Sequence, residues 1–186
     1  MEATLQPSFL TPPKMKTTVG ILALDLGTRT GVASGVFDIS SDVVWNKEKM
    51  VKQTQVEHFE LPSNTYLSAL KEQVRKRMEG LVQEDGMVIV VPQPTFGRKV
   101  IARHWKMIGV IEQLAEEHGN TTVFEVLDNH VRKVVCGSVS VDGNKSKYER
   151  RMLRKQMVML RYGSFVHTDD EADALMFLEW YLTSRI

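Results

Sequence analysis

The sequence predicts an α/β domain built on one mixed five-stranded sheet with helices on its faces. Two observations lead to this prediction: a tight turn joins the first two strand-like segments, and helical patterns separate the later ones. Strands joined by short turns lie antiparallel, whereas strands separated by a helix must cross over and lie parallel. The order of these segments therefore predicts three antiparallel strands followed by parallel strands.

Five segments have the composition of strands. The first is a nearly continuous apolar run (TVGILALD), which is typical of a buried strand, and the fourth (MVIVV) is too short for a helix. The third alternates between polar and apolar residues. The predicted strands cover residues 18–25, 31–38, 55–61, 87–91 and 122–126, and the polar residues 39–54 predict an irregular connection.

Apolar residues recur at helical spacing in the rest of the chain. The predicted helices cover residues 67–81, 99–118, 128–135, 147–162 and 169–183. Gly119 and Gly163 end the second and fourth of these helices, and Thr168 or Asp169 caps the last one. The periodicity of the second helix places Trp105 on its core-facing side.

The composition fits a single folded domain. Of the 186 residues, 42 % are hydrophobic and 25 % are charged, which is ordinary for a globular protein and excludes disorder throughout. We expect a flexible N-terminal tail over residues 1–16, which hold three prolines, and one domain over residues 17–186. No apolar run reaches the ~20 residues of a membrane helix, and the first residues lack the pattern of a signal peptide. Because the single Cys136 cannot form a disulfide within the chain, which suits a reducing compartment, we expect a cytoplasmic protein.

The charges are unevenly distributed, although the net charge is only +1. The segment from Asn144 to Tyr162 carries a basic set opposed only by Glu149, namely Lys145, Lys147, Arg150, Arg151, Arg154, Lys155 and Arg161. Four acids follow a few residues later. Basic side chains hold phosphates and carboxylates hold metal ions, so this pairing favours a metal-dependent nuclease. The alternative is that the basic segment is the solvated face of a helix.

Asp25 ends the first predicted strand and begins the motif D-L-G-T-R-T-G. A lone carboxylate at the end of a buried strand is costly unless a charged group meets it. Gly27 allows a backbone or a phosphate to approach, and Gly31 is expected to let the chain reverse. Actin-like ATPases open with a similar strand and turn, so this motif alone does not decide the function.

Asp170 and Asp173 lie three residues apart in the first turn of the last predicted helix, and both therefore project from one face. The helix N-terminus partly offsets their repulsion. The small residues Ala172 and Ala174 leave room for the helix to lie close against the sheet. Together with Asp25, these carboxylates are suited to Mg²⁺ or Mn²⁺, which prefer oxygen ligands. The alternative is a capping run with surplus acids.

These motifs resemble those of the RuvC-type Holliday junction resolvases, in particular the phage-like members, within the RNase H-like superfamily. ILALDLGTRTGVAS is similar to their opening motif, whose Asp binds metal, and DDEADAL is similar to their closing motif with two Asp three residues apart. TFGRKVIARHWKMIGVIEQLA resembles their central helix. VLDNHVRKVVCGSVSVDGNKSKYE resembles their segment of a basic helix, a Gly, a loop and a Lys, with Lys147 on that Lys. The resemblance covers roughly residues 21–182.

One position departs from the family. The resemblance implies a Glu at the end of the fourth strand as a further metal ligand, but this strand ends in Val91-Pro92-Gln93-Pro94. The expected Glu falls on or beside Pro92, and Gln93 is the nearest side chain with an oxygen. Three interpretations stay open: metal binding is weakened, another acid such as Glu60 or Glu112 takes the place, or the chain binds DNA without cutting it.

The resemblance implies an RNase H-like fold and a structure-selective endonuclease that cuts branched DNA, such as four-way junctions, with two Mg²⁺ or Mn²⁺ ions. One ion would activate water and the other would stabilise the leaving 3′ oxygen. Asp25, Asp170 and Asp173 would hold the ions, and Lys147 would stabilise charge or position the water. The expected DNA-binding residues are Arg29, Arg98, Lys99, Arg103, Lys145, Arg150, Arg151 and Arg154.

A four-way junction has two-fold symmetry and needs paired cuts, so a homodimer is expected, in a bacterial or phage-infected cell. Two other functions stay open beside the nuclease. The first is a catalytically impaired protein of the same fold that binds branched DNA, which the missing Glu favours. The second is a YqgF-like nuclease that acts on RNA, although the basic helix and the D-x-x-D motif favour DNA.

Overall fold

The computed structural model describes residues 17–184 apart from residues 82, 84, 95–97 and 138–145. Its strands are β1 (Thr18–Asp25), β2 (Arg29–Asp38), β3 (Gln55–Glu60), β4 (Met87–Pro92) and β5 (Thr121–Val126). Its helices are α1 (Lys47–Gln53), α2 (Tyr66–Glu79), α3 (Arg98–His118), α4 (Asp128–Cys136), α5 (Lys147–Tyr162) and α6 (Asp169–Thr183), with a short 3₁₀ turn at Gly163–Phe165.

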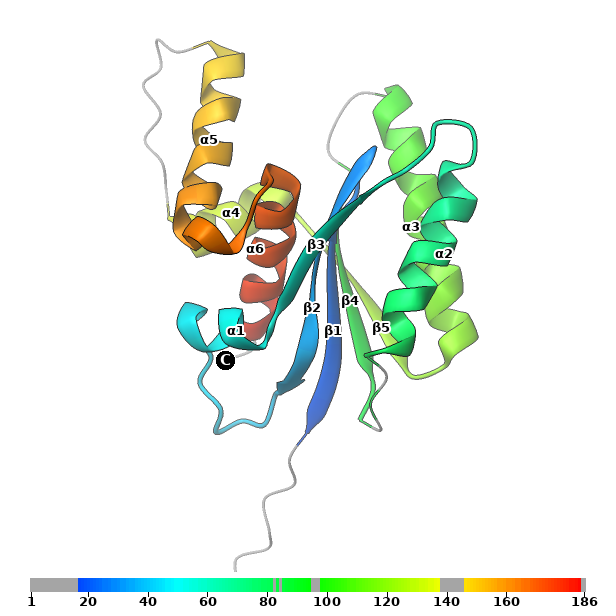
Figure 1. The fold of residues 1–186 in the computed structure, drawn as a ribbon, viewed down its shortest axis with the longest axis vertical. Coiled ribbons are helices and arrows are strands. Elements are labelled where there is room, and N and C mark those ends of the chain that lie inside the picture. The colour runs from blue at the N-terminus through cyan, green and yellow to red at the C-terminus, as the bar shows by residue number, and fades with distance from the viewer. Residues whose placement is uncertain (1–16, 82, 84, 95–97, 138–145, 185–186) are drawn as a thin grey trace, which may run out of the picture.

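The five strands form one mixed sheet in the order β3-β2-β1-β4-β5. β2 pairs antiparallel with both β1 and β3, while β4 pairs parallel with both β1 and β5. Helices α2 and α3 cover one face, and α4, α5 and α6 lie on the other (Figure 1). The predicted fold class is therefore confirmed, including the change from antiparallel to parallel pairing.

The side chains of β1 alternate between two cores, one on each face of the sheet. Ile21 and Ala23 belong to the core under α6, whereas Leu22 and Leu24 belong to the core under α2 and α3. Successive side chains of a strand point to opposite faces. Asp25, which follows in the same alternation, therefore points to the α6 side.

The helix α6 runs through the centre of its layer, and 11 of its 15 residues are buried. Thr168 caps this helix, because its side chain accepts a hydrogen bond from the backbone N–H of Glu171. In return, the backbone N–H of Thr168 donates to the Glu171 carboxylate. This reciprocal cap, rather than Asp169, fixes where the helix begins. The cap places Asp170 in the first turn of the helix.

Gly31 lies within β2 and does not reverse the chain, contrary to the expectation from the sequence. It pairs with Asp25 across the β1–β2 ladder, and its backbone contacts the first turn of α6. A Cβ atom at this position would overlap the backbone carbonyl of Asp170. The glycine therefore lets the acidic end of α6 lie directly beside the end of β1.

Two further expectations were wrong. Residues 47–53 form the helix α1, capped by Asn46 and anchored by the buried Met50, where an irregular connection was predicted. A single buried residue in seven leaves too little periodicity to detect such a helix. Trp105 is 47 % exposed, because α3 buries Met107, Ile108 and Ile111 instead.

Cys136 is half-buried and packs against the α6-side core, and burial raises its pKa. The expected tail over residues 1–16 lies outside the described residues. Within the described part of the chain, no helix is long and apolar enough to cross a membrane.

Candidate functional site

A cleft of about 1110 Å³ opens at the end of the sheet where β1 and β4 finish. Its walls come from the ends of four strands and from the first turns of α4 and α6, with α3 and α5 alongside. The residues that line it are Asp25, Leu26, Gly27, Thr28, Arg29, Glu60, Pro92, Gln93, Pro94, Ile101, His104, Asp128, Asn129, Arg132, Arg150, Arg154, Lys155, Asp169, Asp170 and Asp173. Segments more than a hundred residues apart in the sequence therefore meet in one site.

Asp25 lines this cleft from the end of β1 and is partly buried. Burial, followed by the negative charges of Asp173, Asp170 and Asp128, raises the pKa of Asp25 well above its usual range. The nearby cation Arg132 only partly opposes this effect. A carboxylate held among other carboxylates is one that a bound cation would stabilise.

Asp170 and Asp173 enter the cleft from the first turn of α6, as their spacing predicts. Asp173 is only 9 % exposed, and burial raises its pKa although Arg132 opposes the effect. Its Oδ1 atom is buried and forms an ion pair with Arg132, but within the described structure it makes no hydrogen bond of good geometry. The structure thus brings Asp25, Asp170 and Asp173 to one cleft.

Basic side chains neutralise these acids. Arg29 pairs with Asp170 and, at 2.9 Å, with Asp169, and Lys155 also pairs with Asp169. Arg29, which was expected to bind DNA, therefore forms ion pairs with two acids of α6. The cleft holds both signs of charge in direct contact.

Arg132 is the most buried of these cations, with 12 % of its side chain exposed. One of its Nη atoms lies 2.8 Å from Asp128 Oδ1, and the other lies 3.0 Å from Asp173 Oδ1. Burial lowers the pKa of Arg132, but Asp173 and Asp128 outweigh burial and raise the pKa above its ordinary value. One guanidinium thus sits between two carboxylates from different helices.

The donor chemistry of the cleft fits a hard divalent cation, because the five buried or partly buried acids that line it offer carboxylate oxygens. One of these oxygens, the buried Asp173 Oδ1, makes no hydrogen bond of good geometry and is held by its ion pair with Arg132. Among the described residues, no three His, Cys, Asp or Glu side chains are grouped closely enough to hold an ion in their present rotamers. Arg29 and Arg132 contact the carboxylates that such an ion would need. Ion binding therefore requires these side chains to exchange partners.

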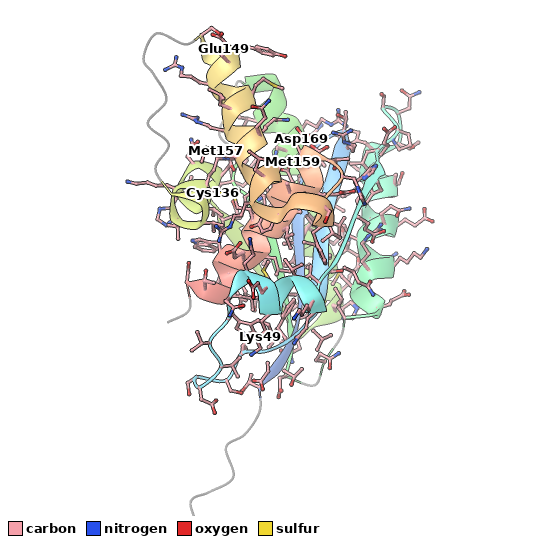
Figure 2. All side chains as sticks on the ribbon, turned by 60° about the vertical axis from the view of Figure 1, so that its left-hand side comes forward. Lys49, Cys136, Glu149, Met157, Met159 and Asp169 are labelled. Carbon is pink, nitrogen blue, oxygen red and sulfur yellow. The ribbon has the colours of Figure 1, made fainter. Side chains whose placement is uncertain are left out.

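The basic wall of the cleft comes from α5. Arg150, Arg154 and Lys155 line it, and α5 packs on α6, beside which it stands in Figure 1. In Figure 2, Glu149 marks the N-terminal end of α5 and Asp169 marks the start of α6. The ion pair between Lys155 and Asp169 links the two helices. Three cations from α5 thus line the same cleft as the acids.

Other residues predicted to bind DNA are placed differently. Arg103 stacks over the Tyr66 ring, with its guanidinium carbon 4.5 Å from the ring centre, and does not line the cleft. Lys145 lies outside the described residues, as do the side chains of Arg98, Lys99, Lys147 and Arg151, although the last four belong to described helices.

At the end of β4, Pro92 and Gln93 line the cleft where the family resemblance implies a Glu. Val88 and Val90 face the α6-side core, so Pro92 continues their alternation toward Asp25. His104 contacts the Pro92 carbonyl at 3.0 Å, and burial lowers the pKa of this histidine. The residue facing Asp25 from β4 is therefore apolar.

Sequence reasoning missed Asp128 and Arg132. Asp128 follows β5 by two residues, and an acid just after a predicted strand was a detectable signal of the same kind as Asp25. Arg132 follows Asp128 by four residues on one helical face, a spacing that favours an ion pair. Its contact with Asp173 depends on how α4 packs against α6, which the spacing does not reveal.

Comparisons with known proteins bear on the fold. No family model and no curated protein sequence matches the chain. The Thermus thermophilus RuvC structure matches with a TM-score of 0.56 and 18 % identity, over 89 % of this chain and 95 % of that one. T. thermophilus RuvC in complex with Holliday junction substrate matches with a TM-score of 0.57 and 14 % identity, over 90 % and 95 %.

The yeast mitochondrial Holliday junction resolvase Ydc2 is more distant, with a TM-score of 0.40 and 14 % identity over 92 % of this chain and 80 % of that one. The two RuvC structures show that this chain has the RuvC-type, RNase H-like fold. At these identities, the function has to be argued from the cleft itself.

Proposed function

We propose that this protein is a structure-selective endonuclease that acts on branched DNA with divalent metal ions. One observation carries the proposal: Asp25, Asp170 and Asp173, from opposite ends of the chain, line one cleft whose outer wall bears Arg150 and Arg154. Acids that hold cations beside arginines that hold phosphates are what phosphodiester hydrolysis requires.

Asp25, Asp170 and Asp173 would hold Mg²⁺ or Mn²⁺, which when bound would activate water and stabilise the leaving oxygen. Arg150 and Arg154 would bind phosphates and place the backbone across the acids. Arg29 would stay with Asp169 and orient the first turn of α6. Lys147 begins the helix that carries the two arginines, and we assign it to charge stabilisation at the cut phosphate.

Branched DNA is the proposed substrate because one RuvC neighbour is described in complex with a Holliday junction. A four-way junction presents two equivalent strands, so a homodimer with two clefts is part of the proposal. The described chain offers one such cleft per copy.

The proposal is tested by incubating the chain with a labelled four-way junction and with a linear duplex of the same sequence, in Mg²⁺ or Mn²⁺. We expect cuts in the junction and not in the duplex, and we expect Asp25→Asn to abolish cutting while junction binding persists. Equal cutting of duplex and junction would contradict structure selectivity. Cutting by the Asp25→Asn variant would contradict the assigned centre.

A second candidate function is a junction-binding protein with little nuclease activity. Pro92 favours it, because the position that faces Asp25 from β4 supplies no ligand, and so do the ion pairs of Arg132 with two of the acids. If the chain binds junctions tightly but cuts them slowly, Pro92→Glu should increase the cutting rate, with Gln93→Glu as a control one residue along. Competition with structured RNA tests whether the substrate is DNA.

A further inference from the structure

We infer that Asp128 supplies the fourth carboxylate of the metal-binding site, in place of the acid that is absent from the end of β4. This inference rests on the proposed function, since it concerns the same cleft. It assigns a ligand to a position outside the opening and closing motifs that predicted the three metal-binding acids. The argument depends on where β5 ends, on which face its chain emerges, and on what Asp128 contacts.

The end of β5 lies beside the end of β4. Pro92 pairs with Val126 in the parallel ladder, and the backbone N–H of Gln93 donates a 2.7 Å hydrogen bond to the Val126 carbonyl. Asp128 comes two residues later, at the first position of α4. Because β4 lies between β1 and β5, the apolar Pro92 has the end of β1, with Asp25, on one side and the end of β5, followed by Asp128, on the other.

The chain also emerges on the required face. Phe124 and Val126 pack into the α6-side core, as Val88 and Val90 of β4 do. From there α4 packs against α6, and Asp128 lines the same cleft as Asp25. Asp128 therefore lies in the same cleft as the three predicted acids.

The contacts of Asp128 show that it already shares a cation with a predicted ligand. Arg132 lies 2.8 Å from Asp128 and 3.0 Å from Asp173, so a single positive group holds both carboxylates. Asp173 Oδ1, the atom that faces this guanidinium, is buried, and its 3.0 Å contact with Arg132 is an ion pair without good hydrogen-bond geometry. A divalent cation that displaced Arg132 would find the carboxylate oxygens of Asp128 and Asp173 already close to one position.

The other candidate acids are less well placed. Glu60 lines the cleft from the end of β3, where it is the ladder partner of Arg29 in β2. Because β2 separates β3 from β1, Glu60 lies on the opposite side of Asp25 from the β4 position. Glu112 is exposed on α3 and is not among the residues that line the cleft. Among the acids considered for the missing ligand, Asp128 is the one beside the vacated strand end.

The test is Mn²⁺ binding to the full chain in the absence of DNA, measured by isothermal titration calorimetry. We expect Asp128→Asn to weaken Mn²⁺ binding by at least about tenfold, the order found when groups that support a metal site are removed. Glu125→Gln is the matched control, because Glu125 is an exposed acid three residues earlier that does not line the cleft. This control should change the affinity by less than about twofold.

A rescue separates loss of a ligand from loss of the fold. Adding Pro92→Glu to Asp128→Asn should restore most of the Mn²⁺ affinity, because it returns a carboxylate to the adjacent strand end. Unchanged affinity in Asp128→Asn would overturn the inference, and so would weakened binding that Pro92→Glu fails to restore in a folded double variant.

Asp25→Asn keeps the inference distinct from the proposed function. If Asp25→Asn weakens Mn²⁺ binding and Asp128→Asn does not, the inference alone fails. If the unaltered chain binds no Mn²⁺, or if Asp25→Asn has no effect on binding, the proposed metal centre fails and the inference fails with it.

Discussion

Gly31 of β2 leaves the space that the backbone carbonyl of Asp170 occupies, so the acidic end of α6 rests directly on the strand paired with β1. Because Gly31 is the partner of Asp25 in that ladder, this contact sets how near the α6 acids come to Asp25. The geometry of the cleft therefore depends on a missing side chain as much as on the acids themselves.

Gly31→Ala is expected to destabilise the fold by about 1–3 kcal/mol, the usual cost of overpacking, because the first turn of α6 must move away from the sheet. Urea unfolding measures this change. Gly109→Ala is the matched control, since Gly109 is exposed in α3 and nothing lies within 4 Å of an added Cβ. It should stabilise the chain by about 1 kcal/mol through helix propensity. Equal effects of the two substitutions would contradict the close contact.

Asp25→Asn is expected to stabilise the metal-free protein by roughly 0.5–2 kcal/mol while it removes the proposed nuclease activity. Burial and three neighbouring acids oppose the ionised form of Asp25, and a neutral amide relieves that repulsion. Thermal unfolding in EDTA measures the gain. A lower melting temperature in EDTA would show that the Asp25 carboxylate stabilises the fold instead.

Arg132→Gln should destabilise the metal-free protein by about 3–5 kcal/mol, because it leaves the carboxylates of Asp128 and Asp173 without their buried counter-charge. Saturating Mn²⁺ should then raise the melting temperature of the variant more than that of the unaltered chain, since the ion replaces the lost charge. The check is a pair of thermal melts with and without Mn²⁺. An equal or smaller rise in the variant would argue against exchange between Arg132 and the ion.

The double substitution of Arg150 and Arg154 by Ala should weaken junction binding and flatten its salt dependence, because each lost phosphate contact removes ~0.9 from the slope of log K against log salt. Fluorescence anisotropy over a range of salt concentrations measures that slope. The control replaces Lys76 and Lys106, which are exposed on the helices of the opposite face. If both double variants change the slope equally, the change comes from the lower net charge and not from lost phosphate contacts in the cleft.

The strands and long helices were predictable because burial imposes a period on their residues. TVGILALD and MVIVV are confirmed as β1 and the main part of β4, and the basic helix spans Lys147–Tyr162 as predicted. The seven-residue helix α1 was missed because it buries only Met50. Trp105 was wrongly placed in the core because α3 has more apolar residues than its buried face holds. The packing of α3 against β5 and α2 decides which of these residues are buried.

The sequence by itself determined that Asp25 ends a buried strand, that Asp170 and Asp173 share a helix turn, and that a basic helix precedes them. These are local properties, which spacing along the chain fixes. Only the tertiary structure decided that Asp128 stands beside the end of β4 and that Arg132 reaches from α4 to an acid of α6. Such contacts depend on strand order and on helix packing, and both are set by burial across the whole domain, which no local spacing encodes.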